Sequence, residues 1–249
     1  MNNISISIIT KDEERNIERL LASCEGFKDI VVIDSGSNDQ TVEIANALGA
    51  TCLEMQWMGF GLQKQLAVEA CQYDWVLSLD ADEELSSELL TAISRLELSD
   101  PSTAFEFKRK SYFLGRPVNF SGWQNDCVVR LFNRTTSNFS DQLVHEKIIG
   151  YNKKIRVNDG CIYHHSYQSE DDVNRKTDLY GSLGAEELAR NRRTPYSSLM
   201  IAAKSVFAFF RTFILRLGIL DGPTGLRISL MNAKVTYGKY QKFNKLVCR

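Results

Sequence analysis

Residues 75–84 read WVLSLDADEE, an apolar run that ends abruptly in a cluster of carboxylates. The run Trp75–Leu79 has the length and composition of a buried β-strand, so the carboxylates fall where a strand ends. Asp80 and Asp82 are one residue apart and can meet a divalent cation and the ribose of a nucleotide together. Their oxygens suit Mg²⁺ or Mn²⁺. Because an acidic pair also suits an ordinary solvated turn, the preceding chain must decide between the two interpretations.

Strand-like and helix-like patterns alternate through the sequence before this cluster. Short β-branched runs over Ile4–Thr10 and Asp29–Asp34 are each followed by apolar residues at helical spacing, and Ala50–Met55 supplies a third strand. A further helix is expected over Phe60–Gln72. This alternation predicts an α/β fold built on a parallel sheet with right-handed crossovers.

Three of these strands end in polar residues, Thr10, Asp34 and Asp80. Ligands of open α/β sheets bind beyond the carboxyl ends of the strands, so we expect these residues to share one rim. Asp34 is followed by Ser-Gly-Ser-Asn-Asp, whose small side chains allow a base or ribose to approach the backbone. An Asx turn explains Asp34 alone, whereas Asp80 on the same rim favours a nucleotide site.

Three stretches, SIITKDEERNI (7–17), VVIDSGSNDQT (31–41) and WVLSLDADE (75–83), resemble family 2 glycosyltransferases in their order and separations. The resemblance implies the GT-A fold, a nucleotide-binding α/β/α sandwich with a mixed central sheet. It also implies transfer of a sugar from a nucleotide diphosphate donor. By residue, it implies base and ribose contacts for Thr10, Glu13, Asp34 and Asp39, a donor contact for Lys64, and ribose and metal contacts for Asp80 and Asp82.

The second half of the chain narrows the resemblance. SGWQNDCVVRLFNR (121–134) and LVHEKI (143–148) are similar to the branch that adds glucose to heptose in the inner core of lipopolysaccharide. That branch implies UDP-glucose as the donor. Two alternatives also fit: a polyprenyl-phosphate sugar transferase, which would share the donor half, and a catalytically silent nucleotide-sugar-binding protein. A dinucleotide-dependent oxidoreductase does not fit, because acidic residues stand where G-x-G-x-x-G would follow the first strand.

An inverting transfer needs one carboxylate near the acceptor hydroxyl to remove its proton. Glu146 is the first candidate for this base, and Asp126 is its rival. The metal would neutralise the departing diphosphate. His145 is a candidate to bind the metal or phosphate, or to orient Glu146.

Other residues of the second half are candidates for the acceptor. Trp123 offers an aromatic face to a sugar ring, although a core position suits it equally. Arg130 is a candidate contact for the diphosphate or the acceptor. His164 and His165 are adjacent in a predicted strand, so only one of them can face the site.

The charge of the chain is unevenly distributed. The net charge is −1, yet residues 204–249 carry nine Lys and Arg against one acid, Asp221. A helical wheel over Ser197–Arg216 gathers the polar and basic residues on one arc, which favours a helix lying on an inner-membrane surface. Lys204 and Arg211 interrupt the apolar run that a spanning helix needs. Packing on the catalytic domain or on a second copy is the alternative, and no nucleic-acid-binding motif accompanies the charge.

These patterns divide the chain into three predicted parts: a nucleotide-sugar-binding half (1–103), an acceptor-binding and catalytic half of the same domain (104–194) and a basic amphipathic helical tail (195–249). The six scattered cysteines form no C-x-x-C pair, which predicts reduced thiols. The first residues lack the features of a signal peptide. We therefore expect a peripheral protein on the cytoplasmic face of the inner membrane, with the linkage and oligomeric state left open.

Overall fold

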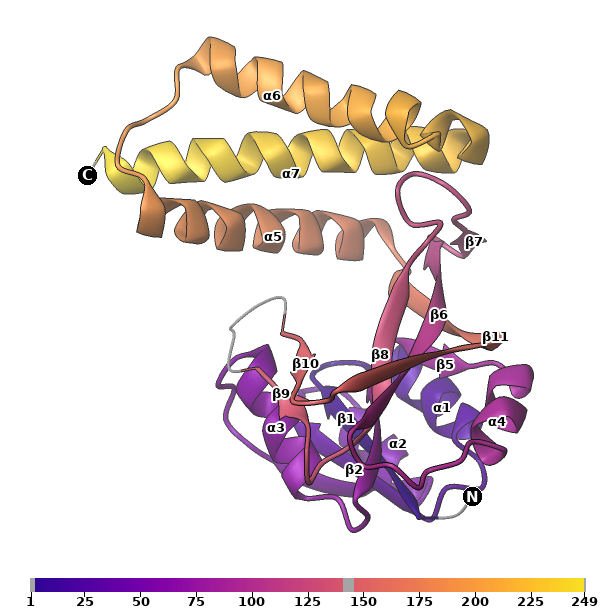
Figure 1. Cartoon of the computed structure of the whole chain (residues 1–249). Helices are drawn as coiled ribbons and strands as arrows, with labels where there is room; N and C mark the ends of the chain where they lie inside the picture. The colour runs from indigo at the N-terminus through magenta and orange to yellow at the C-terminus, as the bar shows by residue number, and fades with distance from the viewer. Residues whose placement is uncertain (1–2, 141–145, 249) are drawn as a thin grey trace. The chain divides into compact units, whose positions relative to one another are not determined.

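A computed structural model describes residues 3–140 and 146–248 and divides the chain into two compact units (Figure 1). The first unit comprises Met1–Arg109 and Asp126–His164, and the second comprises Lys110–Asn125 and His165–Arg249. The chain passes between the units inside strands β6 and β11. These boundaries differ from those of the three predicted parts. Hydrophobic patterning shows where helices give way to strands, but it cannot show that one strand contributes residues to two units.

Nine strands of the described chain form one mixed sheet in the order β3-β2-β1-β4-β8-β6-β11-β5, with β7 paired to β6. The first four of these are parallel, whereas β8 runs antiparallel to both β4 and β6. The strands are β1 (Ile4–Thr10), β2 (Asp29–Asp34), β3 (Thr51–Glu54), β4 (Trp75–Asp80), β5 (Glu83–Leu85), β6 (Thr103–Phe113), β7 (Arg116–Pro117), β8 (Cys127–Asn133) and β11 (Lys153–Tyr167). A separate pair is formed by β9 (Asn138–Phe139) and β10 (Ile148–Ile149).

Different helices cover the two faces of the sheet, as Figure 1 shows. Val32 of β2 packs in one cluster with side chains of α1, α2 and α4, whereas its neighbours Val31 and Ile33 pack with α3 and the β9–β10 pair. Buried strands apolar on both faces are expected of a parallel sheet between helices. The helices are α1 (Glu14–Ser23), α2 (Thr41–Ala47), α3 (Phe60–Glu69) and α4 (Ser87–Ser94). The α/β/α layering with a mixed sheet confirms the predicted fold class.

The second unit is built on three long helices, α5 (Glu170–Asn191), α6 (Ser198–Phe210) and α7 (Pro223–Val247). A π-helical turn, η1 (Arg211–Leu215), and a 3₁₀ turn, η2 (Gly218–Asp221), connect α6 to α7. In Figure 1 α7 runs between α5 and α6. The start of α7 approaches η2 so closely that a Cβ on Gly225 would lie 1.8 Å from the carbonyl oxygen of Gly218, so this contact requires glycine.

All six cysteines are free of disulfide bonds in the structure. Burial raises the pKa of Cys24 and of Cys71 to about 12. Since the thiolate is the reactive form, these two side chains act as inert apolar groups of the core.

Candidate active site

The loops that follow β1 and β2 are joined to each other by hydrogen bonds. The backbone N–H of Asn38 donates to Asp12 Oδ1 at 2.8 Å, and the N–H of Glu13 donates to Thr41 Oγ1 at 2.8 Å. The N–H of Glu14 donates to Asp39 Oδ2 at 3.2 Å. The predicted nucleotide contacts Glu13 and Asp39 therefore lie on two loops that hold each other in place at the carboxyl end of the sheet.

Asp34 and Asp39 each accept several hydrogen bonds within this rim. Asp34 is almost fully buried and accepts the N–H groups of Gly36 and Ser37 at 2.9 and 2.8 Å, so it forms the Asx turn considered above. Burial would raise the pKa of Asp39, but hydrogen bonds from the Thr41 side chain and nearby backbone hold it below its ordinary value. The rim thus presents carboxylates fixed by hydrogen bonds, and their contacts to base and ribose stay a prediction.

Two polar atoms behind this rim lack partners within the described residues. Thr10 Oγ1 is buried at the end of β1, and Gln63 Oε1 is buried on α3. Gln63 donates through Nε2 to Ser35 Oγ at 3.2 Å. A buried polar atom without a partner costs about 1–3 kcal/mol, so such atoms mark places where a bound group can complete the hydrogen bonding. The sequence did not indicate Gln63, because nothing in its helical pattern distinguishes it from a surface glutamine.

A row of alternating charges crosses the first unit and includes both rival bases. Lys64 Nζ lies 2.7 Å from Glu146 Oε1 and 2.8 Å from Asp80 Oδ1. Arg130 then binds both Asp80 and Glu83, the latter at 2.5 Å. The row continues from Glu83 to a second arginine. We call these seven residues the charge ladder: Glu146, Lys64, Asp80, Arg130, Glu83, Arg109 and Asp126.

Glu83 lies between Arg130 and Arg109 in the charge ladder and is fully buried. One of its oxygens, Oε1, accepts from Arg130 and from Arg109, the latter at 3.1 Å, and the other accepts the backbone N–H of Asp80 at 3.1 Å. Arg109 also binds Asp126 Oδ2 at 2.7 Å. A buried carboxylate satisfied by two guanidinium groups and a backbone N–H is rigidly held. Glu83 therefore fixes the strand end that carries Asp80.

The ladder determines the charge state of Asp80. Burial would raise the pKa of this carboxyl, but the charges and hydrogen bonds of Arg130 and Lys64 outweigh burial and hold its pKa well below the ordinary value. Burial would lower the pKa of Arg130, and Asp80 and Glu83 reverse that effect and raise it. Asp80 is therefore a permanent carboxylate. Arg130 is buried between two acids, which favours a positioning role over the predicted contact with diphosphate or acceptor.

Asp82, the second carboxylate of the D-x-D pair, lies beside a histidine of β11. His164 Nε2 is 3.4 Å from Asp82 Oδ1, and both side chains are largely buried. His165 belongs to the second unit and stacks on Tyr112 with ring centroids 4.8 Å apart. The two adjacent histidines therefore have different surroundings, as the strand period predicts.

The residues around Asp82 fit a divalent cation only in part. The Asp82 carboxylate suits Mn²⁺ or Mg²⁺, which commonly take one or two protein ligands and complete their shell with phosphate oxygens and water, whereas the His164 imidazole is not a ligand that Mg²⁺ favours. Among the described residues, no group of three or more His, Cys, Asp and Glu side chains could hold a metal by itself. The oxygens of a bound diphosphate would have to complete the site. His145, the other predicted ligand, lies outside the described residues.

The family model for "Glycosyl transferase family 2" matches residues 5–169, which include the rim, the D-x-D pair and the whole charge ladder. The chain belongs to glycosyl transferase family 2. Among its relatives is an uncharacterized glycosyltransferase of Rickettsia typhi, 31% identical over 99% of this chain and 88% of the relative. The lipopolysaccharide core biosynthesis glycosyltransferase LpsC of Rhizobium meliloti is 25% identical over 95% of this chain and 93% of its own length.

Among solved structures, that of S. aureus TarS 1–349 matches 98% of this chain and 90% of its own chain, with 14% identity and a TM-score of 0.46.

Membership of glycosyl transferase family 2 makes this chain a transferase of sugars. The predicted donor-contacting residues, from Thr10 to Asp82, fall inside the family match, and so does β8 with Arg130.

Trp123, the predicted sugar platform of this family 2 chain, lies in the second unit. It stacks on Tyr167 with ring centroids 6.2 Å apart and meets Phe113 edge-on. Asp221 accepts the N–H of Phe120 at 3.1 Å and the hydroxyl of Ser121 at 2.6 Å, which fixes the loop before Trp123. Trp123 is thus held in an aromatic cluster, and its contact with an acceptor stays a prediction.

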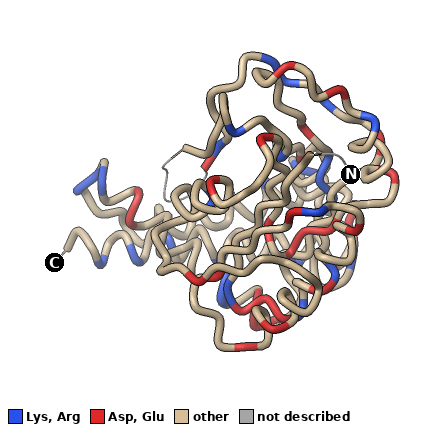
Figure 2. The backbone as a smooth tube through the Cα atoms, turned by 90° about the horizontal axis from the view of Figure 1, so that it is seen from below, with Lys and Arg blue, Asp and Glu red and all other residues tan. Residues whose placement is uncertain are grey.

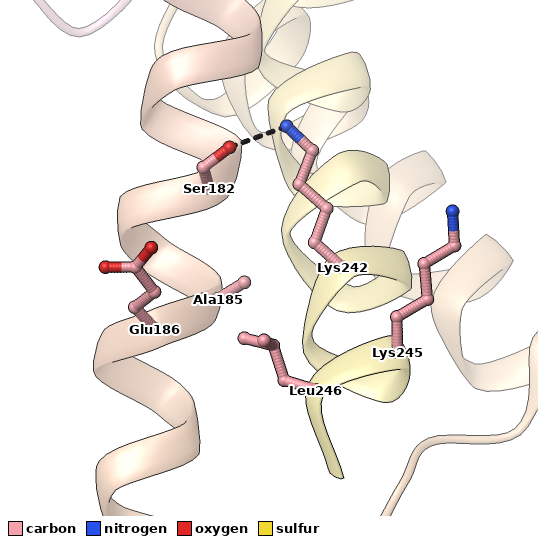
Figure 3. A pocket seen from close by; sticks show the side chains of 6 residues that line it. All are labelled: Ser182, Ala185, Glu186, Lys242, Lys245 and Leu246. Atoms are coloured by element: carbon pink, nitrogen blue, oxygen red, sulfur yellow. Dashed lines mark hydrogen bonds between the residues drawn. The ribbon is translucent and has the colours of Figure 1, made fainter. Parts of the chain in front are cut away.

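A pocket between α5 and α7 of the second unit contains none of the predicted site residues (Figure 3). Lys242 reaches across it to Ser182 Oγ at 2.7 Å and also binds Asp178. Its lining is otherwise formed by Ala185, Glu186, Lys245 and Leu246. Because Lys242 is already paired with Ser182 and Asp178, we assign the pocket to a packing gap between α5 and α7.

Proposed function

We propose that this family 2 enzyme is an inverting glycosyltransferase that moves glucose from UDP-glucose to a heptose of the lipopolysaccharide inner core. One observation carries the proposal: Lys64 bridges Asp80, at the strand end where the donor is expected, and Glu146, a candidate base. In this arrangement the Lys64 ammonium group binds both Asp80, on the donor side, and Glu146, the candidate proton acceptor. The name of the Rhizobium meliloti relative supports the lipopolysaccharide core as the acceptor class.

In the proposed reaction the acceptor hydroxyl attacks the anomeric carbon from the face opposite the diphosphate. A new C–O bond forms, the bond from the anomeric carbon to the diphosphate oxygen breaks, and UDP leaves with the electron pair. The hydroxyl proton passes to Glu146, whose carboxylate is oriented by Lys64. One displacement inverts the configuration and requires no covalent enzyme intermediate, which is why a single base suffices.

The rest of the ladder keeps this arrangement rigid. Glu83 and Arg130 hold Asp80 at the end of β4, and Asp80 in turn binds Lys64, which also binds Glu146. Preorganised charges of this kind need not reorient as charge develops during the reaction. We propose that Thr10, Glu13, Asp34 and Asp39 contact the base and ribose.

We propose that Asp82 holds a Mg²⁺ or Mn²⁺ ion, with His145 and, through its place beside Asp82, His164 as further candidate ligands. When bound, the ion supplies neutralisation of the diphosphate charge. Asp82 stands two residues beyond Asp80, the last residue of β4, so its carboxylate is close in sequence to the anchored Asp80. The acceptor side is assigned to Trp123, with Arg130 as a positioning residue.

We propose that the acceptor is lipid-linked and that the enzyme works as a peripheral protein at the cytoplasmic face of the inner membrane. A lipopolysaccharide core precursor carries acyl chains, so an enzyme that modifies it must work at a lipid surface. Nucleic acid is not among the proposed partners.

The test is UDP release from a panel of UDP-hexoses with Mn²⁺ or Mg²⁺, with and without heptose-terminated lipopolysaccharide core. We expect release that requires the metal and the core acceptor, is greatest with UDP-glucose and falls by at least about a hundredfold in Asp82→Ala. Asp74→Ala, a change of the same residue type at an exposed position, should leave release unchanged. Full activity of Asp82→Ala with metal present would refute the metal assignment.

Adding a polyprenyl phosphate to this panel as a second acceptor separates the alternatives. Transfer to a polyprenyl phosphate, in place of the core, would assign the enzyme to the lipid-phosphate class. Tight UDP binding with no release from any donor and acceptor would identify a silent binding protein.

A further inference from the structure

The segment from α6 to η2 exposes an unusual run of large apolar side chains. Leu199 is 82% exposed and Leu215 is 70% exposed, and five others between them and just beyond are more than half exposed. Isolated exposed apolar residues are normal, but a continuous run along one segment marks an interaction surface. We call it the apolar face, formed by Leu199, Val206, Phe207, Phe210, Leu215 and Leu220.

The opposite side of the same segment is packed inside the second unit. Ile201, Ala208 and Thr212 are buried, and α6 lies along α7 (Figure 1). Asn232 of α7 donates to Thr212 Oγ1 at 3.1 Å, and Asn244 of α7 exchanges hydrogen bonds with Tyr196 just before α6. Polar contacts at both ends of α6 therefore hold it on α7, with the apolar face turned away.

This packing decides between spanning and lying on a bilayer. Ser198–Leu215 is the one stretch of the described chain that is long and apolar enough to cross a membrane by length and composition, with a mean hydropathy of 1.6. Crossing would carry its partner α7 into the lipid. Exposed or half-exposed cations on α7, such as Arg227, Lys234 and Lys245, make that transfer costly. Only the apolar face can enter lipid while α7 stays in water.

Charge identifies the kind of partner. Lys204 and Arg211 lie within the α6–η1 segment, and the basic residues continue along α7, seen as repeated blue bands near the C-terminus in Figure 2. Asp221, the one acid from residue 204 onward, is occupied by hydrogen bonds to the 119–121 loop. A second copy docked on this face would bring like charges together. Anionic lipid headgroups complement them.

We propose that the apolar face inserts shallowly into an anionic lipid bilayer, which docks the second unit parallel to the membrane surface. The aromatic and aliphatic side chains enter the boundary between headgroups and acyl chains, while Arg211 and its neighbours remain at the headgroups. This inference deepens the proposed peripheral location and rests on it. Its test uses no sugar, so failure here leaves the transfer reaction unaffected, and failure of transfer leaves the docking measurable.

The experiment is flotation of the full chain with vesicles of phosphatidylcholine alone or mixed with phosphatidylglycerol. We expect binding to the mixed vesicles that weakens with salt. Phe207→Ser combined with Phe210→Ser should weaken it at least about tenfold, since two phenyl groups that insert into the lipid are lost. The matched control is Leu179→Ser with Tyr180→Ser, which removes two similarly exposed apolar side chains from α5 and should leave binding unchanged. Arg211→Gln should weaken binding about fivefold.

A depth measurement distinguishes docking from crossing. Tryptophan placed by Phe207→Trp should be quenched more by lipids brominated near the headgroup than by lipids brominated at the bilayer centre. Stronger quenching at the centre would overturn shallow docking in favour of a spanning helix. Equal flotation of the Phe207 and Phe210 double variant and the wild type would overturn the proposal. So would a dimer in size-exclusion chromatography that this double variant dissociates, if the wild type fails to float.

Discussion

Glu146 and Asp126, the two candidate bases, occupy opposite ends of the charge ladder. Glu146 is held by a lysine that also contacts Asp80, whereas Asp126 is held by Arg109, which is separated from Asp80 by Arg130 and Glu83. A base must reach the acceptor hydroxyl next to the donor, and only Glu146 shares a cation with the donor-side carboxylate. Position in the ladder therefore ranks the two.

We predict that Glu146→Gln lowers kcat by about 10²–10⁴-fold, because the amide cannot accept the acceptor proton. The KM for the UDP-sugar should change little. Asp126→Asn, the same exchange of carboxylate for amide at the other end of the ladder, should retain most of kcat. Steady-state kinetics of both variants checks this, and the reverse pattern would move the base to Asp126.

At the residue scale, the sequence predicts which carboxylates stand at the strand ends, but it does not predict the side chains that hold those carboxylates in position. Asp34 and Asp80 were identifiable because each ends an apolar strand. Parallel strands run in the same direction, so their carboxyl ends lie at the same edge of the sheet. Glu83 was not, since its partner Arg130 is 47 residues away and meets it only through the antiparallel pairing of β8 with β4. A single sequence does not contain that register.

At the element scale, α5 depends on a local signal at its first turn. Ser169 accepts the N–H of Asp172 at 3.1 Å, and Asp172 in return accepts the N–H of Ser169 at 3.1 Å, which completes a capping box. Burial would raise the pKa of Asp172, but hydrogen bonds from Ser169 and Arg175 hold it below its ordinary value. A capping box is a local signal, contained within four consecutive residues of the sequence.

We predict that Ser169→Ala lowers the free energy of unfolding by about 1 kcal/mol through loss of this cap. The control is Ser198→Ala, since Ser197 and not Ser198 caps α6. That substitution should change the free energy by less than about 0.5 kcal/mol. Urea unfolding of both variants decides the matter, and equal effects would mean that the capping box contributes nothing specific.

Elements without such local signals were harder to predict. The β9 and β10 strands are two residues each, too short for a period of two to be detected. The π-helical turn at Arg211–Leu215 extends α6 without any Pro or Gly to mark the change. In both cases tertiary contacts determine the local structure.

At the scale of the whole molecule, the ladder joins α3, β4, β5, β6 and β8 by charge, so its protonation should affect global stability. The folded-state pKa of Asp80 lies well below its ordinary value of 3.8. A depressed carboxyl pKa contributes stability that is present above the unfolded-state pKa and is lost as pH falls toward the folded-state value. The contribution of Asp80 is therefore complete at neutral pH.

We predict that wild type is more stable than Asp80→Asn at neutral pH and that the difference shrinks once the pH falls below about 4. Urea unfolding of both proteins from about pH 7 to about pH 3 measures this difference. Comparing the two proteins at each pH cancels the titration of groups that they share. A difference that stays constant throughout acid conditions would show that Asp80 is not the group responsible.

The way Asp221 holds residues 119–121 constrains how such a protein arises in evolution. The second unit consists of a segment inserted into the first, Lys110–Asn125, and a segment that follows it, His165–Arg249. A gene fusion that appended only the C-terminal helices would leave the N–H groups of Asn119 and Phe120 without their carboxylate, and an isolated insertion would do the same. The two segments form one inheritable module, and swapping the C-terminal helices between relatives requires exchanging the inserted loop with them.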